Sequence, residues 1–105
     1  MSNVVYINTY KLKEGLSASD FIIAAERLNN EFISKQKGYI SLTFLADGDD
    51  MVDLLVFESM EDLMVCAKSL KKEKNTDLAD KFYSFIDDLD NCKGSVYTVE
   101  KDFKK

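Results

Sequence analysis

The chain has 105 residues, which is enough for one domain with its own core and too few for two. Its 19 acidic residues against 14 basic ones give a formal net charge of −5, which argues against binding to a nucleic-acid backbone. The absence of histidine excludes histidine-based triads, histidine-ligated haem and most zinc sites. We therefore expect a single domain over residues 1–105 that uses no cofactor, no metal and no nucleic acid.

The same composition predicts a cytoplasmic protein. No apolar run approaches the roughly 20 residues needed to cross a bilayer, and the first residues do not resemble a signal peptide. Two cysteines, Cys66 and Cys92, are too few for a disulfide framework and are expected to be reduced thiols. We expect no membrane interaction.

The first part of the chain predicts a strand followed by a helix. Residues 4–12 carry β-branched and aromatic side chains and lead into a Lys-Glu-Gly turn. Ser17 is the expected N-cap of the helix because Asp20 follows three positions later, and Gly38 is its expected left-handed stop. Between them, apolar residues recur at helical spacing. These residues are Phe21, Ala25, Leu28 and Phe32.

Residues 39–46 and 51–58 predict two strands joined by the turn Asp47-Gly48-Asp49-Asp50. The aspartates also resemble the start of a calcium loop, with Glu58 at the twelfth position. However, Met51 and Val52 stand at the fifth and sixth positions, where a calcium loop requires a ligand and a glycine. The prediction is therefore a tight hairpin turn.

The second half predicts two helical segments and a last strand. Ser59 begins a helix with the apolar stripe Leu63, Ala67 and Leu70, beside Cys66. After a polar interruption over residues 71–75, a third helical segment is expected from Asp77 to Leu89, capped by Asn75 or Thr76. Residues 95–100 predict the last strand. The order β-α-β-β-α-(α)-β predicts an α+β, ferredoxin-like fold with a four-stranded antiparallel sheet and helices on one face.

Strict alternation of side chains along the strands places apolar residues on both faces of this sheet. Helices cover only one face, and exposing nine apolar side chains at about 1.5–3 kcal/mol each would exceed the net stability of a domain. We therefore expect a homodimer through the sheet face; a register shift in one strand, or wider helix cover, is the alternative. The first set is Val5, Ile7, Ile40, Leu42, Phe44, Val52, Leu54, Val56 and Val96. The second set is Tyr6, Asn8, Tyr10, Leu12, Tyr39, Leu45, Asp53, Leu55, Phe57, Tyr97 and Val99.

The segment Asn8-Thr9-Tyr10-Lys11-Leu12-Lys13-Glu14-Gly15 resembles the first-strand signature of the dimeric α+β-barrel superfamily, in its antibiotic-biosynthesis-monooxygenase-like branch. Residues 17–21, 35–41 and 57–62, together with Asp53, are similar to its later landmarks in order and spacing. The resemblance implies a homodimer whose two sheets close a barrel, with a pocket between sheet and helices in each subunit. Because one fold hosts many functions, it is less specific for activity.

The resemblance implies two kinds of activity: cofactor-independent oxygenation of aromatic polyketides, and haem degradation. In such enzymes an asparagine on the first strand faces the pocket, and Asn8 matches that position. Haem-degrading members also use a tryptophan at the end of the third strand and a histidine on the following helix. Phe57 stands at the tryptophan position and the chain contains no histidine, so haem degradation is disfavoured.

The alternation places Asn8, Asp53 and Phe57 on one face with Tyr6 and Tyr10. In an apolar pocket the pKa of a carboxyl rises, so Asp53 is the candidate general base. Asn8 and Tyr6 or Tyr10 are the candidate hydrogen-bonding groups, and Phe57 is a candidate stacking wall. Further ligand contacts could come from the helices, although aromatic residues at helical spacing are also typical of a core. These candidates are Phe32, Met64 and Phe82.

Structural roles compete with the catalytic ones. Asn8 could satisfy backbone groups near a strand end, and Asp53 could pair with a lysine or face water at a barrel rim. Three functions therefore stay open at this stage. They are an oxygenase-like enzyme acting on a small aromatic or polyketide-like molecule, a non-catalytic module that binds a small apolar ligand, and a structural or stress-associated dimer with a filled interior.

Overall fold

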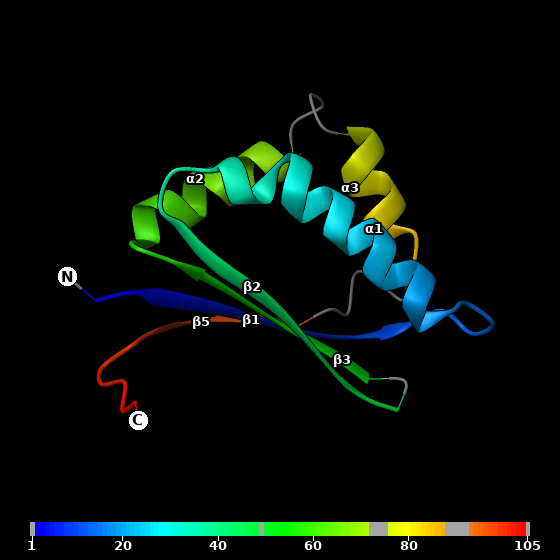
Figure 1. Ribbon diagram of the computed structural model, residues 1–105, viewed down its shortest axis with the longest axis horizontal. Coiled ribbons are helices and arrows are strands. Elements are labelled where there is room, and N and C mark those ends of the chain that lie inside the picture. The colour runs from blue at the N-terminus through cyan, green and yellow to red at the C-terminus, as the bar shows by residue number, and fades with distance from the viewer. Residues whose placement is uncertain (1, 49, 72–75, 88–92, 105) are drawn as a thin grey trace.

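A computed structural model of the protein describes residues 2–48, 50–71, 76–87 and 93–104. All of its helices lie on one face of an antiparallel sheet (Figure 1), which confirms the predicted α+β, ferredoxin-like architecture. The strands are β1 (Val4–Leu12), β2 (Tyr39–Asp47), β3 (Asp50–Phe57), β4 (Ile86–Asp87) and β5 (Lys93–Thr98). The helices are α1 (Ala18–Glu31), α2 (Met60–Lys71) and α3 (Thr76–Tyr83), with a 3-10 turn at Ile33–Lys35.

The sheet has five strands but is four strands wide. Its order is β2-β3-β1, and both β4 and β5 pair with the remaining edge of β1. β5 pairs with β1 from Val4 to Thr9, and β4 pairs with Lys11 and Leu12. The predicted four strands are therefore present, and the two-residue strand β4 is an addition that the sequence pattern did not indicate.

The predicted helix from Asp77 to Leu89 is wrong in its second half. The α3 helix ends at Tyr83, and the chain then turns so that the carbonyl of Phe85 accepts a hydrogen bond from the amide of Lys13, 2.8 Å away. Phe85 and Ile86 are buried as expected, but from a turn and a strand. Their spacing fits a helix equally well, which explains the error. Leu89 and the proposed cap Asn75 lie outside the described residues.

The two predicted serine caps are confirmed. The Ser17 hydroxyl accepts from the amide of Asp20 at 3.4 Å, and the Ser59 hydroxyl accepts from the amide of Asp62 at 3.1 Å. Gly38 adopts φ +82°, but it lies beyond the 3-10 turn and does not end α1 itself, which stops at Glu31. β2 and β3 stay paired as far as Asp47 and Asp50, as the predicted hairpin requires, and Asp49 of the predicted turn lies outside the described residues.

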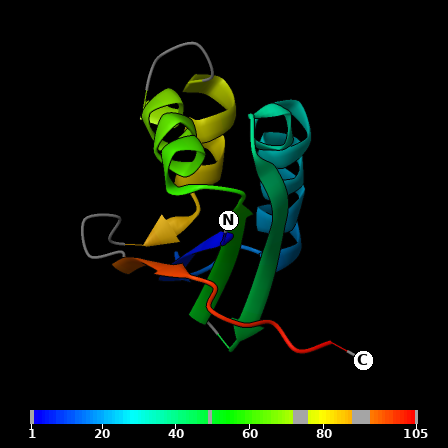
Figure 2. The same ribbon diagram turned by 90° about the vertical axis from the view of Figure 1, so that its left-hand side faces the viewer.

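The core lies between the sheet and the helices, where α1 forms one column of the helix layer and α2 with α3 forms the other (Figure 2). Phe21 on α1 is fully buried and meets four aromatic rings. Cys66 on α2 is buried and unpaired, as predicted, whereas Cys92 lies outside the described residues. Among the described residues, none of the helices combines enough length with enough apolar character to cross a lipid bilayer.

The sheet face without helices differs from the predicted one because two strands have another register. A bulge between Tyr39 and Ser41 shifts β2, so that Leu42 and Phe44 lie opposite Leu55 and Asp53 on the helix side. Leu45, which strict alternation grouped with Asn8 and Asp53, lies opposite Val52 on the uncovered face instead. A one-residue shift exchanges the two faces of a strand completely.

The predicted faces of the last strand are also exchanged in the structure. Val96 lies opposite Tyr6 and shares its helix-facing side, whereas Tyr97 lies opposite Val5 and turns to the uncovered side. Val99, which was counted with the strand, follows its end. We call the uncovered side the open face. Its apolar residues are Val5, Ile7, Leu45, Val52, Leu54, Val56 and Tyr97.

Candidate functional site

A buried carboxylate lies at the centre of the sheet on its helix-facing side. Asp53 on β3 stands directly opposite Asn8 on β1, and the Asn8 amide donates from Nδ2 to Asp53 Oδ1 over 3.0 Å. The Tyr10 hydroxyl donates to the other carboxylate oxygen, Oδ2, over 2.9 Å. Asp53 is only 6% exposed and is the one buried polar or charged residue within the described part of the chain. The structure thus joins three residues that the sequence placed on one face.

Burial controls the acid–base behaviour of this group. Desolvation raises the pKa of Asp53 above its ordinary value of 3.8, while the hydrogen bonds from Asn8 and Tyr10 oppose that rise by stabilising the charged form. A carboxyl with a raised pKa is a better proton acceptor than an exposed one. Its two donors also fix the orientation of the carboxylate, which a general base requires.

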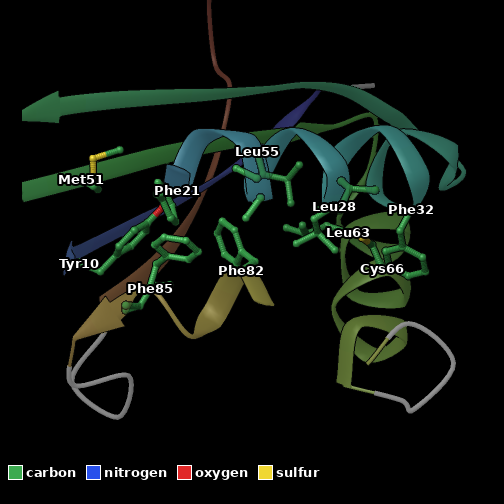
Figure 3. Close-up of a cluster of buried hydrophobic side chains, with 14 of the residues drawn as sticks. Tyr10, Phe21, Leu28, Phe32, Met51, Leu55, Leu63, Cys66, Phe82 and Phe85 are labelled. Carbon is green, nitrogen blue, oxygen red and sulfur yellow. The ribbon is translucent and has the colours of Figure 1, made fainter. Parts of the chain in front are cut away.

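Aromatic rings cover the site. The Tyr10 ring packs edge-on against Phe21, with ring centroids 6.0 Å apart, and Phe21 in turn contacts Phe82 at 5.1 Å and Phe44 at 5.7 Å. Phe44 lies opposite Asp53 on β2, whereas the sequence analysis had placed it on the other face. Figure 3 shows Tyr10, Phe21, Phe82 and Phe85 gathered at one end of the interior. These rings pack around Tyr10, one of the two donors to the buried Asp53 carboxylate.

The remaining candidates are distributed along the interior. Phe57 is fully buried near the end of β3 and packs edge-on against Tyr39, with centroids 6.2 Å apart. Phe32 is buried at the opposite end of the interior from Tyr10 (Figure 3). Met64 is 48% exposed on α2. The structure therefore places Phe82 in the aromatic cluster that contains Phe21 and Tyr10, whereas Phe32 lies at the other end of the interior and Met64 is partly exposed.

Gly94 lies beside Asn8 and Tyr6, and the sequence pattern did not identify it as part of the site. Gly94 on β5 lies opposite Asn8, and a Cβ on it would meet the Tyr6 hydroxyl oxygen at 2.5 Å and Asn8 Oδ1 at 2.7 Å. The predicted last strand covers residues 95–100 and so does not include Gly94. A glycine immediately before a strand pattern is the signal that could have identified it, since glycine within a strand often marks a close approach.

The fold is shared with solved oxygenase structures. SnoaB, a cofactor-independent oxygenase from Streptomyces nogalater, superimposes over the full length of both chains with a TM-score of 0.75 at 13% identity. A monooxygenase from the gene ActVA-Orf6 of Streptomyces coelicolor, solved with nanaomycin D, has a TM-score of 0.69 at 16% identity, over 99% of this chain and 93% of that one. The chain has the ferredoxin-like fold of the antibiotic-biosynthesis-monooxygenase-like proteins.

Two further solved structures share this ferredoxin-like fold. A putative antibiotic biosynthesis monooxygenase from Nitrosomonas europaea has a TM-score of 0.70 at 14% identity, covering 93% of this chain and 90% of that one. A dimeric ferredoxin-like protein from an uncultured marine organism has a TM-score of 0.68 at 13% identity, covering 100% and 94%. No protein-family model and no curated protein matches the sequence. At these identities the likeness shows the fold, as predicted, and does not extend to an activity.

Proposed function

We propose that the protein is a homodimeric, cofactor-independent oxygenase-type enzyme that acts on a small, electron-rich aromatic or polyketide-like phenol. The observation that carries this proposal is the buried Asp53 carboxylate, held by Asn8 and Tyr10 under an aromatic cover. SnoaB, whose fold it shares, is described as a cofactor-independent oxygenase, and the ActVA-Orf6 monooxygenase was solved in complex with nanaomycin D.

In the proposed reaction Asp53 removes a proton from the substrate, and Asn8 and Tyr10 keep the carboxylate oriented for that step. The resulting anion of a reduced anthracene-type phenol reacts with molecular oxygen. The ring carbon loses two hydrogens and gains one oxygen atom, and the second oxygen atom leaves with both hydrogens as water. Oxygen is the only oxidant, so the balance needs no external reductant.

The substrate has to reach a carboxylate that the aromatic rings cover. Phe21 and Phe82 lie over the site from α1 and α3, so binding requires these rings to move aside. Once displaced, they offer flat apolar surfaces on which an aromatic substrate can stack. The same rings then exclude water from the reacting anion.

The homodimer of this proposal uses the open face. Seven apolar residues, Val5, Ile7, Leu45, Val52, Leu54, Val56 and Tyr97, lie there without helix cover. A second copy would bury them around a two-fold axis. One protein with the same fold is described as a dimeric ferredoxin-like protein, which supports this assembly.

The dense packing of the interior favours a second candidate, a dimer with a structural role and no catalysis. Phe21 is fully buried and Tyr10 is also buried, so aromatic side chains fill the space around the carboxylate. In this case Asp53 would serve only as a hydrogen-bond acceptor that fixes the β1–β3 pairing.

Oxygen consumption distinguishes the two candidates. Uptake should be followed with a panel of anthrone-type phenols for the wild type, Asp53→Asn and Asn8→Ala, with Asp50→Asn on the same strand as the control. General-base catalysis predicts a loss of about 10²–10⁴-fold in Asp53→Asn, a smaller loss in Asn8→Ala and an unchanged rate in the control. Equal rates in all four proteins, or no uptake by the wild type, would exclude the oxygenase.

A further inference from the structure

We propose that Gly94 is a positioning residue for the buried base: by carrying no side chain, it makes room on β5 for the Tyr6 phenol and the Asn8 amide, and so holds Asn8 Nδ2 on Asp53. The inference rests on the proposed role of Asp53 for its effect on activity. Its structural part can be tested without any substrate.

One row of four residues crosses the sheet and joins Gly94 to the base. Phe44 on β2, Asp53 on β3, Asn8 on β1 and Gly94 on β5 lie opposite one another in successive strand pairs. Along this row burial decreases, from the buried Asp53 through the half-buried Asn8 to the exposed Gly94. Within this row of described residues, Asn8 thus stands between the Asp53 carboxylate and β5.

The space above Gly94 is already occupied by the neighbouring side chains. A Cβ at this position would lie 2.5 Å from the Tyr6 hydroxyl oxygen, 2.6 Å from Tyr6 Cε1 and 2.7 Å from Asn8 Oδ1. Real Cβ atoms essentially never approach other atoms more closely than 3.0 Å. An alanine at this position therefore forces at least one of these groups to move.

The backbone does not require glycine at this position. Gly94 is not among the glycines with positive φ, so alanine can adopt its backbone conformation without strain. Glycine inside a strand also weakens the strand relative to alanine. The requirement for glycine therefore comes from the two side chains that lie over it.

In Gly94→Ala we expect the side chains of Tyr6 and Asn8 to move rather than the paired backbones of β1 and β5. β1 and β5 are paired continuously from Val4 and Thr98 to Thr9 and Lys93, so separating them would break several ladder bonds. The Tyr6 hydroxyl and Asn8 Oδ1 are the ends of rotatable side chains and can move at small cost. Because the amide of Asn8 is rigid, moving Oδ1 also moves Nδ2 and disturbs its 3.0 Å hydrogen bond to Asp53.

Gly94→Ala should therefore leave the fold intact and disturb the base. Carbon-13 NMR titration of the Asp53 carboxyl, assigned with Asp53→Asn, measures the effect directly. The groups that face Asp53 are Asn8 and Tyr10, while Lys11 and Asp50 pair with each other at 2.6 Å on the open face. Loss of the Asn8 donor should raise the pKa of Asp53 towards the value in Asn8→Ala.

The double variant Gly94→Ala/Asn8→Ala completes a mutant cycle. If Gly94 acts through Asn8, the double variant should show no further rise in the pKa of Asp53 beyond Asn8→Ala alone. Ser95→Ala, on the same strand but on the open face, is the matched control and should titrate like the wild type. Additive shifts in the double variant, or an unchanged pKa of Asp53 in Gly94→Ala, would overturn the proposal.

A second variant covers the case in which Gly94→Ala does not fold. Tyr6→Leu removes the two closest obstacles, and of the three atoms nearest to the added methyl group Asn8 Oδ1 then remains in Gly94→Ala/Tyr6→Leu. The pKa of Asp53 should still be higher in this double variant than in Tyr6→Leu alone, and equal values would refute the inference.

Activity separates this inference from the proposed function. Where oxygen uptake is present, misplacement of the base should reduce kcat in Gly94→Ala by about 10²-fold, with Ser95→Ala unchanged. A shifted pKa of Asp53 without oxygen uptake by the wild type would keep the positioning role and reject the oxygenase. Oxygen uptake that depends on Asp53 but not on Gly94 would support the oxygenase and reject the positioning role of Gly94.

Discussion

Asn8 and Asp53 lie directly opposite each other on neighbouring antiparallel strands, and a 3.0 Å hydrogen bond joins the Asn8 amide to the Asp53 carboxylate. This pair, completed by the Tyr10 hydroxyl, places a carboxylate, the one buried charged residue in the described part of the chain, in the mostly apolar interior. A buried charge costs stability unless it is well hydrogen-bonded. The effect of burying the Asp53 carboxylate on the free energy of unfolding can therefore be measured.

The first prediction concerns stability against pH. Burial raises the pKa of Asp53, so the folded protein binds this proton more tightly than the unfolded chain does. The stability from this proton is fully present below the unfolded value near 3.8 and is lost as pH rises through the raised pKa. Asp53→Asn should therefore become progressively more stable relative to the wild type as pH rises through the raised pKa of Asp53.

Urea unfolding at fixed protein concentration between pH 3 and 8 tests whether the stability of Asp53→Asn relative to the wild type increases with pH. Asp50→Asn is the matched control, because Asp50 is exposed on the same strand. Its stability should stay within about 0.5 kcal/mol of the wild type. A variant Asp53→Asn that loses stability as pH rises would contradict the prediction.

A second prediction concerns Tyr10→Phe, which removes the hydroxyl donor to Asp53 Oδ2. Hydrogen bonds to charged groups contribute about 1.5–3 kcal/mol, so the variant should be destabilised by this order at neutral pH and less in acid, where Asp53 is protonated. The pKa of Asp53 should rise further. Tyr97→Phe, which alters a tyrosine on the open face, should leave the pKa of Asp53 unchanged.

A third prediction concerns the open face. Leu54 lies at its centre, opposite Ile7 on β1 and Thr43 on β2. In Leu54→Lys a charge would be buried at the proposed interface, so the mass measured by light scattering should fall from twice the 12.0 kDa of the chain to one chain. Val65→Lys, on the exposed side of α2, should remain dimeric. A wild type with the mass of one chain at micromolar concentration would disprove the dimer.

A fourth prediction concerns Cys66, whose thiol is 1% exposed and has a pKa raised by burial to about 11. In a Cys92→Ser background, which leaves one thiol, a disulfide reagent at pH 8 should react only at the rate at which the protein opens. Adding guanidinium should accelerate the reaction to that of the unfolded chain. Rapid modification of the native protein would show that Cys66 is accessible.

Local patterns predicted the elements of this fold well. Ser17 and Ser59 cap the helices as expected, because a serine with an acid three residues later is a signal within one turn of chain. The strand over residues 4–12 has the predicted bounds. The pairing of β1 with β3 likewise follows simple alternation, so Tyr6, Asn8, Tyr10, Asp53 and Phe57 share a face as predicted.

Predictions that depended on long-range register were less accurate. The bulge between Tyr39 and Ser41 exchanged the faces of Leu42 and Phe44, and the pairing of β5 with β1 exchanged those of Val96 and Tyr97. Neither shift leaves a mark in the residue pattern, because both faces of these strands are apolar. The same ambiguity extended the third helix beyond Tyr83, since buried residues at helical spacing do not distinguish a helix from a turn followed by a strand.

The sequence by itself determined the order of the helices and the four main strands but not the short strand β4, together with the helix caps and the candidate base, because these depend on neighbours within a few residues or on strict alternation. Only the tertiary structure decided which residues form the open face and that Gly94 lies against Asn8 and Tyr6. The physical reason is that strand register is fixed by the packing of whole strands against one another, and a shift of one residue alters every contact across the sheet.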